Sequence, residues 1–156
     1  MQIVNEQAPA LRVGTWIDEK GFSRVPFKLD DLGKSYKILF CFQHWCPGCH
    51  SFGFPTLKRL VENLSHLGFG FAAIQTVFED EPNNTLDKLR ENQKKYALDI
   101  PFGHDLPLEG QRLPTIMADY QTGGTPWFIV INTDGIIVHS DFRLNAEVLI
   151  RNFVME

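Results

Sequence analysis

The sequence predicts an α/β protein with a mixed central β-sheet flanked by helices on both faces. Apolar runs at 35–42 and 69–78 are typical of buried strands, and the segment between them has helical spacing. Strand, helix, strand is the order of a parallel, right-handed crossover. A later segment, 125–140, predicts two strands joined by a turn at 132–135, with Asp-Gly as the hairpin signal. A parallel half followed by a hairpin half implies a mixed sheet.

The first half of the chain divides into three expected elements. Residues 9–33 are rich in turn formers and predict short strands or a hairpin, an N-terminal β extension of the main fold. The strand at 35–42 follows. The helix after it runs through "FPTLKRLVENLSHLG", and Gly68 is its expected stop signal. Its apolar face is formed by Leu57, Leu60, Val61 and Leu64.

The second half begins, after the strand at 69–78, with a helix expected from Thr85 to about Leu98. Asn84 is the expected cap, with Asp87 in a capping-box position. Its apolar side is formed by Leu86, Leu89 and Tyr96, and its charged residues predict a solvated face.

The last expected elements are a short strand, a helix end or loop, and a closing helix. "IPFGHDL" predicts a short strand, and "MADYQTGG" predicts a helix end or a loop. After the hairpin, "LNAEVLIRNFVM" predicts an amphipathic helix. Its inward residues are expected to be Leu144, Val148 and either Leu149 or Ile150.

Length, net charge and the apolar runs limit the classes of protein to which the chain can belong. With 156 residues, the chain is expected to form one domain, 1–156, and its net charge of −4 argues against nucleic-acid binding. No apolar run is long enough to cross a bilayer, so no membrane segment is expected. The first residues lack a basic n-region and an apolar h-region, which predicts a cytoplasmic protein, or a periplasmic one if a leader has been removed.

The chemistry of the chain is concentrated in "HWCPGCH", His44 to His50. If Cys46 lies where the strand becomes a helix, Pro47 occupies the first helical position, which suits proline. The helix dipole and free N–H groups then stabilise a Cys46 thiolate. Cys49, three residues on, returns to the same side of the helix. We expect Cys46 to be exposed and to attack a disulfide, and the more buried Cys49 to resolve the product. Gly48 would leave room for a partner backbone.

Two other chemistries share this pattern. Cys46, Cys49 and His50 match the haem-attachment motif Cys-x-x-Cys-His. A preceding buried strand, the many strands and the absence of a visible export leader weigh against haem. A closed zinc site needs four ligands. There is no second cysteine pair and the other histidines are scattered, so no metal is predicted. The third cysteine, Cys41, lies in the strand and is expected to be an inert core residue, with a regulatory thiol as the alternative.

Beyond the motif itself, the sequence resembles the thioredoxin superfamily, in its redoxin or TlpA-like branch. A hydrophobic strand, Trp-Cys-x-x-Cys opening a helix, and Thr-Pro before a late strand form the core of the resemblance, which covers most of the chain from about Ala8. It implies a thioredoxin-like fold with an N-terminal β extension and a βα insertion. The further matching segments are "APAL", "DDLGKSYKILFCF", the insert "TVFEDEPNNTLDKLRENQKKYALDIPFGHDL" and "DYQTGGTPWFIVINTDGIIV".

The resemblance also implies roles for individual residues. Pro126 would be a cis-proline facing the cysteine pair, and the backbone of Thr125 would bind the substrate as an added strand. Trp45 would shape the docking surface beside the cysteines. The remaining residues expected at the substrate-binding surface are Pro47, Gly48 and Gly124.

The sequence departs from the family at three positions. Phe40 replaces the buried acid of thioredoxin, and Phe52 replaces a glutamate common in TlpA-like members. Pro55 lies one residue later than the usual helix proline, which predicts a bulge or a displaced kink. Without the acid, His44 and His50 are candidates for moving the Cys49 proton, because histidine titrates near neutrality.

The expected activity is therefore thiol–disulfide exchange with protein thiols or disulfides, coupled to an external reductase or oxidase. No cofactor is expected besides the Cys46–Cys49 redox couple. A peroxiredoxin-like peroxidase is the alternative, but "FCFQHW" lacks the proline and threonine that precede a peroxidatic cysteine. A binding module that has lost catalysis is a third class, disfavoured by retention of both cysteines.

Overall fold

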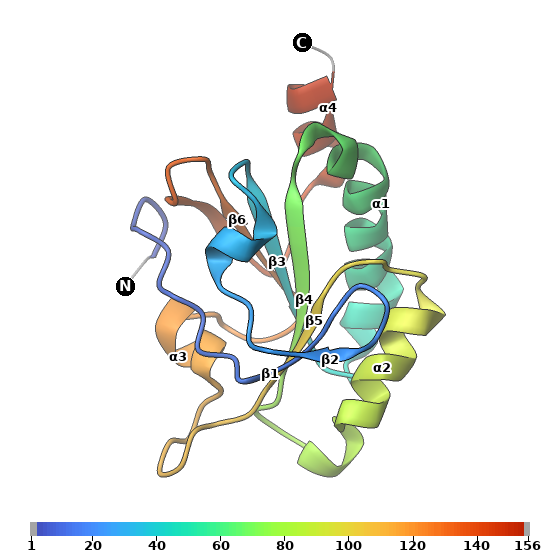
Figure 1. The fold of residues 1–156 in the computed structure, drawn as a ribbon, viewed down its shortest axis with the longest axis vertical. Helices are drawn as coiled ribbons and strands as arrows, with labels where there is room; N and C mark the ends of the chain where they lie inside the picture. The colour runs from blue at the N-terminus through green and yellow to red at the C-terminus, as the bar shows by residue number, and fades with distance from the viewer. Residues whose placement is uncertain (1–2, 155–156) are drawn as a thin grey trace.

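The computed structural model describes residues 3–154, which form a mixed seven-stranded sheet with the order β2-β1-β5-β4-β3-β6-β7 (Figure 1). The strands are β1 (Thr15–Ile17), β2 (Ser23–Arg24), β3 (Lys37–Phe42), β4 (Gly70–Thr76), β5 (Phe102–Asp105), β6 (Trp127–Ile131) and β7 (Ile137–Asp141). The helices are α1 (Phe54–Leu64), α2 (Leu86–Lys95), α3 (Thr115–Tyr120) and α4 (Ala146–Val154). Short 3₁₀ turns lie at Leu29–Leu32, Ser65–Leu67 and Glu81–Asn83.

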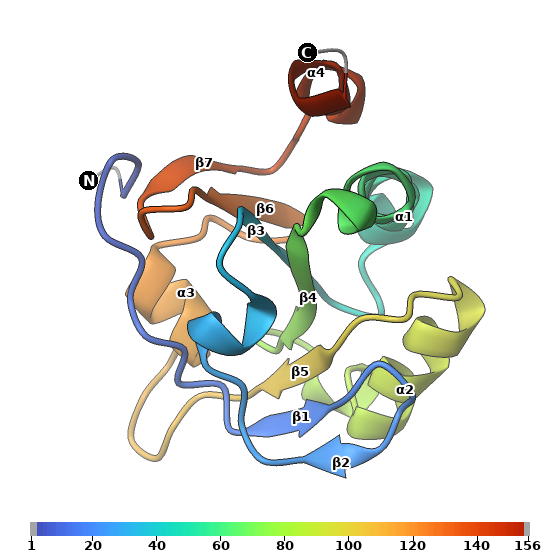
Figure 2. The same cartoon turned by 45° about the horizontal axis from the view of Figure 1, so that its top comes forward.

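The strand directions confirm the mixed sheet. β3, β4 and β5 are parallel neighbours, as their helical crossovers require, and β6 and β7 continue the sheet antiparallel to β3. The predicted βα insertion is α2 and β5, between β4 and β6. The N-terminal extension, β1 and β2, pairs antiparallel with β5 at the opposite edge from β7, as Figure 2 shows.

Two apolar cores cover the two faces of the sheet. Alternate residues of β3 point to opposite faces, so Phe40 joins the core under α1, α2 and α4, whereas Cys41 joins the core under α3. Figure 2 shows α3 across the sheet from the other helices. In the first core, Leu57, Leu60 and Leu64 are fully buried, as the helical spacing predicts.

The start of α2 differs from the prediction by one residue. Thr85 is the cap, because its hydroxyl accepts a hydrogen bond from the Lys88 N–H, and the helix ends at Lys95. The expected Asn84 cap with Asp87 as its partner is wrong. Asn84 is buried, and its side-chain amide instead donates to the carbonyls of Glu79 and Asp80.

The inward face of the last helix is only partly as predicted. Ile150 is buried and Leu144 and Leu149 pack against the core, but Val148 is 45% exposed, so its expected inward position is wrong. Val148 points away because the inward face of α4 runs, at helical spacing, through Ala146, Leu149, Ile150 and Phe153. Met155 lies outside the described residues.

A buried carboxylate explains the helix α3, where a helix end or a loop was expected. Asp105, at the end of β5, accepts hydrogen bonds from the Thr115 N–H, the Thr115 hydroxyl and the Ile116 N–H at 3.1, 2.7 and 2.8 Å. These donors lie at the first turn of α3, whose N–H groups have no partner within the helix. Burial raises the pKa of Asp105, and the three hydrogen bonds oppose that rise.

Replacing Asp105 with alanine is expected to lower the free energy of unfolding by about 3 kcal/mol, because buried donors lose their acceptor. Urea denaturation of the variant and of Asp99→Ala, an exposed aspartate before β5, measures the difference. Equal, small losses in both variants would contradict the capping role.

Among residues 3–154, no helix has the length and apolar character needed to span a membrane.

Candidate dithiol site

The two cysteines of the motif lie at the junction between β3 and the following helix. Helical backbone begins at Pro47, directly after Cys46. The Cys46 N–H donates to the Gln43 carbonyl at 3.1 Å, closing the turn that joins strand to helix. The Cys49 N–H donates to Cys46 Sγ at 3.3 Å. The first sulfur therefore faces the open end of the helix, with the second cysteine one turn away.

Cys46 is less exposed than the sequence predicted. Its exposed fraction is only 5%, and Cys49 is fully buried. The expectation of an exposed Cys46 is wrong because both cysteines pack into the core cluster that contains Phe42 and Phe54. The order of accessibility, Cys46 over Cys49, is as expected.

The surroundings of the two sulfurs shift the pKa values of the two thiols in opposite directions. The pKa of Cys46 is lowered to about 6, first by a hydrogen bond from the Cys49 thiol, then by the Thr125 hydroxyl and the N–H groups of Cys49 and Gly48, against the opposing effect of burial. Burial, and then the interaction with Cys46, raises the pKa of Cys49. At neutral pH the pair therefore holds one thiolate, on Cys46, and one thiol, on Cys49.

The segment before β6 lies against the cysteine motif. The Thr125–Pro126 peptide bond is cis, the isomer that the resemblance implies. A Cβ built on Gly48 would lie 3.4 Å from Pro126 Cδ, so backbone and proline ring are in near contact. The Thr125 hydroxyl lies beside the dithiol and lowers the pKa of each cysteine. Trp45 is 40% exposed beside them, which leaves an aromatic surface open to solvent.

The two candidate histidines are tied to neighbouring elements, and no hydrogen bond joins either ring to a cysteine sulfur within residues 3–154. His50 Nε2 donates to the His44 carbonyl at 2.6 Å, so its Nδ1 accepts from the Tyr96 hydroxyl. His44 Nδ1 pairs with the Asn92 amide at 3.1 Å, and burial lowers the pKa of His44. His50 thus fastens the motif to α2.

The start of the helix contains the bulge that the late proline predicts. Residues Cys49–Gly53 form a π-helical turn, which holds one extra residue, before α1 begins at Phe54 with Pro55 in its first turn. Gly53 is required here, because a Cβ at this position would lie 2.8 Å from the Phe40 ring and 3.1 Å from Pro126.

Gln43 is a residue of the site that the sequence reasoning missed. Its side chain is fully buried and lies 3.4 Å from Thr125 Oγ1. In the amide orientation that satisfies its neighbours, its oxygen accepts from Trp45 Nε1 at 3.3 Å and its nitrogen donates to the Glu79 carbonyl at 3.1 Å. The available signal was a polar residue at the end of an apolar strand.

The third cysteine stands apart from the pair. Cys41 is buried on the opposite face of β3, and burial raises the pKa of its thiol. Within the described range, no group of three histidine, cysteine or acidic side chains has the arrangement of a metal site.

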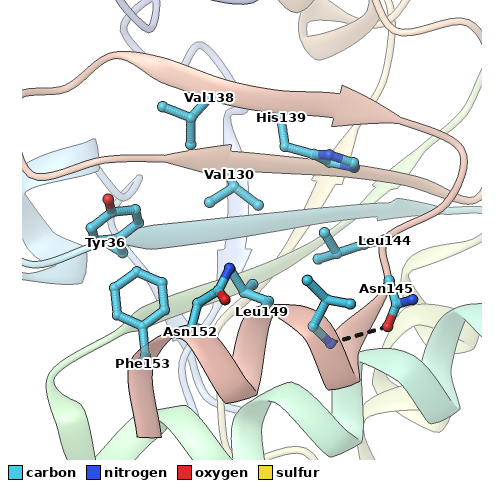
Figure 3. A pocket seen from close by; sticks show the side chains of 10 residues that line it. Tyr36, Val130, Val138, His139, Leu144, Asn145, Leu149, Asn152 and Phe153 are labelled. Atoms are coloured by element: carbon cyan, nitrogen blue, oxygen red, sulfur yellow. Dashed lines mark hydrogen bonds between the residues drawn. The ribbon is translucent and has the colours of Figure 1, made fainter. Parts of the chain in front are cut away.

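A hollow of about 610 Å³ lies between α4 and the strands β6 and β7, away from both cysteines (Figure 3). Tyr36 and Phe153 close one end, and His139 and Asn145 lie toward the other.

The comparisons with known proteins agree with this geometry. A family model described as the AhpC/TSA family matches residues 4–140. A solved thioredoxin-like superfamily protein is 27% identical with a TM-score of 0.81, covering 96% of this chain and 94% of its own. A thiol-disulfide isomerase from Corynebacterium glutamicum is 24% identical with a TM-score of 0.77, covering 96% and 97%. No curated protein matches the sequence.

A further neighbour is the thioredoxin domain of a thiol-disulfide oxidoreductase from Bacteroides vulgatus, 20% identical with a TM-score of 0.71 and covering 99% of each chain. These similarities confirm the predicted thioredoxin-like fold.

Proposed function

The chain belongs to the AhpC/TSA family, and from that premise we propose that it is a thiol–disulfide oxidoreductase in which Cys46 attacks and Cys49 resolves. The observation that carries the proposal is the paired acidity at the helix start. A thiolate with a pKa of about 6 accepts a hydrogen bond from a second thiol whose own pKa is raised. Such a pair has a nucleophile ready at neutral pH and a proton-bearing partner one turn away.

In the first step, the Cys46 thiolate attacks one sulfur of a substrate disulfide. A Cys46–substrate disulfide forms, the substrate S–S bond breaks, and the other substrate sulfur leaves as a thiolate that takes a proton. The charge on Cys46 disappears in this step. Because that charge helps to hold the proton on Cys49, its loss favours deprotonation of Cys49.

In the second step, the Cys49 thiolate attacks Cys46 Sγ and releases the second substrate thiol. Two electrons have then passed to the substrate, the protein holds a Cys46–Cys49 disulfide, and an external dithiol must reduce it. The same steps in reverse oxidise a substrate dithiol. We propose that the Thr125 backbone and Gly124 bind the substrate as an added strand, with Trp45, Pro47 and Gly48 forming the surface beside it. His44 contacts Asn92 through Nδ1, so its Nε2 is not used in that contact. We therefore propose His44 Nε2 as the atom that receives the Cys49 proton.

Alkylation of reduced protein by iodoacetamide is expected to rise with pH around a midpoint of about 6, because only the thiolate reacts. The folded-state pKa of Cys46 is lower than the unfolded value of about 8.5, so the thiolate contributes to the stability of the reduced protein. This contribution is complete above about pH 8.5 and is lost as the pH falls through about 6. Thr125→Val removes a hydrogen bond to the thiolate and should move the midpoint upward. A wild-type midpoint near that of free cysteine would refute the proposal.

A glutathione redox titration tests the exchange itself. The midpoint potential of the Cys46–Cys49 couple is measured by alkylating the free thiols at each glutathione ratio and counting them by mass spectrometry. Cys46 and Cys49 should lose their free thiols together as the couple is oxidised, and Cys41 should not be oxidised. A value near about −270 mV would indicate a reductant, and one near about −120 mV an oxidant.

The same preparation, mixed with hydrogen peroxide in stopped flow, tests the peroxidase alternative. In that class a threonine stands three residues before the reactive cysteine, where this chain has the amide of Gln43. We therefore expect slow peroxide reduction, and a fast reaction would favour the peroxidase.

A further inference from the structure

We propose that the dithiol site selects partner segments that carry an acidic residue and an apolar residue near the reactive cysteine, recognised by Arg143 and Phe142. This inference rests on the proposed function and concerns its substrate class. Both residues lie in the connection between β7 and α4. Nothing in the sequence gave a reason to place this connection beside the motif.

Phe142 extends the apolar surface next to the cis peptide. Its side chain is 43% exposed and packs edge-on against Trp127, with ring centroids 4.7 Å apart. A Cβ built on Gly124 would lie 3.1 Å from the Phe142 ring, so the ring covers the residue that precedes Thr125. A substrate strand paired with Thr125 would therefore place one of its side chains on Phe142.

Arg143 brings a positive charge to the same side of the motif. Its guanidinium carbon lies 4.9 Å from the centre of the Phe52 ring. That ring is 3.5 Å from a Cβ built on Gly48, between the two cysteines. The arginine is exposed, and none of the ion pairs found in residues 3–154 involves it. His139 Nε2 donates to its carbonyl at 2.7 Å, which fixes the connection. A carboxylate on a docked partner can therefore pair with Arg143 without displacing another acid.

The opposite side of the motif has the opposite charge. The Trp45 N–H lies 3.4 Å from the Asn84 side-chain oxygen, and the Asn84 amide nitrogen donates to the carbonyls of Glu79 and Asp80. These hydrogen bonds place the acidic segment beside Trp45. Glu79, Asp80 and Glu81 are all exposed. With a net charge of −4, the protein as a whole repels acidic partners. An acidic side chain is thus favoured at the Arg143 side over the side of Glu79, Asp80 and Glu81, which sets the orientation of the docked segment.

The test uses three extended peptides that differ only beside their cysteine, with glutamate, glutamine or lysine there. Each is presented as a mixed disulfide with 2-mercaptoethanol, a neutral leaving group. The second-order rate of reaction with reduced protein should be about two- to fivefold higher for the glutamate peptide than for the glutamine peptide, as for an exposed ion pair, and lowest for lysine. Salt of about 0.5 M should reduce the difference.

The Arg143→Glu variant should reverse this order, and Arg143→Gln should remove the preference for glutamate. The matched control is Lys34→Glu, which makes the same change in net charge at an exposed position before β3, the opposite end of that strand from the motif. It should keep the wild-type order. Phe142→Ala should slow all three peptides more than it slows hydroxyethyl disulfide, which has no side chain to place on the ring.

Two outcomes separate the inference from its premise. An unchanged glutamate-to-lysine ratio in Arg143→Glu, with normal reaction of hydroxyethyl disulfide, would overturn the proposed recognition alone. Failure of every variant and of the wild type to react with hydroxyethyl disulfide would instead refute thiol–disulfide exchange as the function.

Discussion

Replacing Cys46 with serine is expected to abolish thiol–disulfide exchange, whereas Cys49→Ser should keep the first step and trap a covalent complex. Serine is far less acidic than a thiol, so Cys46→Ser loses the nucleophile and the rate should fall by at least about 10³-fold. In Cys49→Ser the mixed disulfide on Cys46 has no second thiol to release it. Mass spectrometry after mixing with a peptide disulfide should show the protein plus one peptide arm, released by dithiothreitol.

Cys41→Ser is the matched control for both variants. Cys41 is buried on the other face of β3, so its replacement should leave exchange intact, apart from a modest loss of stability. A trapped complex in Cys46→Ser, or loss of exchange in Cys41→Ser, would show that the nucleophile has been assigned to the wrong sulfur.

Replacing Phe40 with alanine is expected to lower the free energy of unfolding by about 3–5 kcal/mol. Phe40 is fully buried, and its ring centroid lies 5.0 Å from those of both Phe54 and Phe128. The ring also supports Gly53 in the π-helical turn. Its removal leaves a cavity beneath the cysteine motif. Guanidinium denaturation of the reduced protein, compared with Phe22→Ala at a position 67% exposed, measures the effect.

The same variant addresses the missing acid of the family. Phe40 carries no charge and no hydrogen bond, and the groups that lower the Cys46 pKa are Cys49, Thr125 and the backbone at the helix start. We therefore expect the alkylation midpoint of Phe40→Ala to stay at about 6 where the variant is folded. A shift toward the free-cysteine value would mean that the ring, rather than these hydrogen bonds, governs the acidity.

The chemistry of the site could be read from the chain because its causes are local. Cys46 follows a strand and opens a helix, so the dipole, the free N–H groups and the second thiol are all set within a few residues. The bulge was also foreseeable, since Pro55 is displaced by one position and the helix must accommodate the extra residue. Apolar runs and helical spacing predicted the order of strands and helices along the chain for the same reason: each is a periodicity along a short segment.

What the sequence did not reveal depends on residues far apart in the chain. The helix α3 forms at Thr115 because Asp105, ten positions earlier, accepts its first N–H groups. Gln43 joins Trp45 to the loop at Glu79 through one buried amide. His50 turned out to bind Tyr96 across the space between two helices.

By itself, then, the sequence predicted the fold class and pointed to Cys46 and Cys49 as the proposed redox pair, because backbone dipoles and side-chain periodicity act between near neighbours. Only the tertiary structure decided that Cys46 is almost covered and that Arg143 lies over Phe52 beside the motif. Exposure and the approach of distant side chains are set by how complete elements pack. That packing brings the connection after β7 to the start of the helix. Arg143, in this connection, follows Cys49 by 94 positions in the chain (143 minus 49).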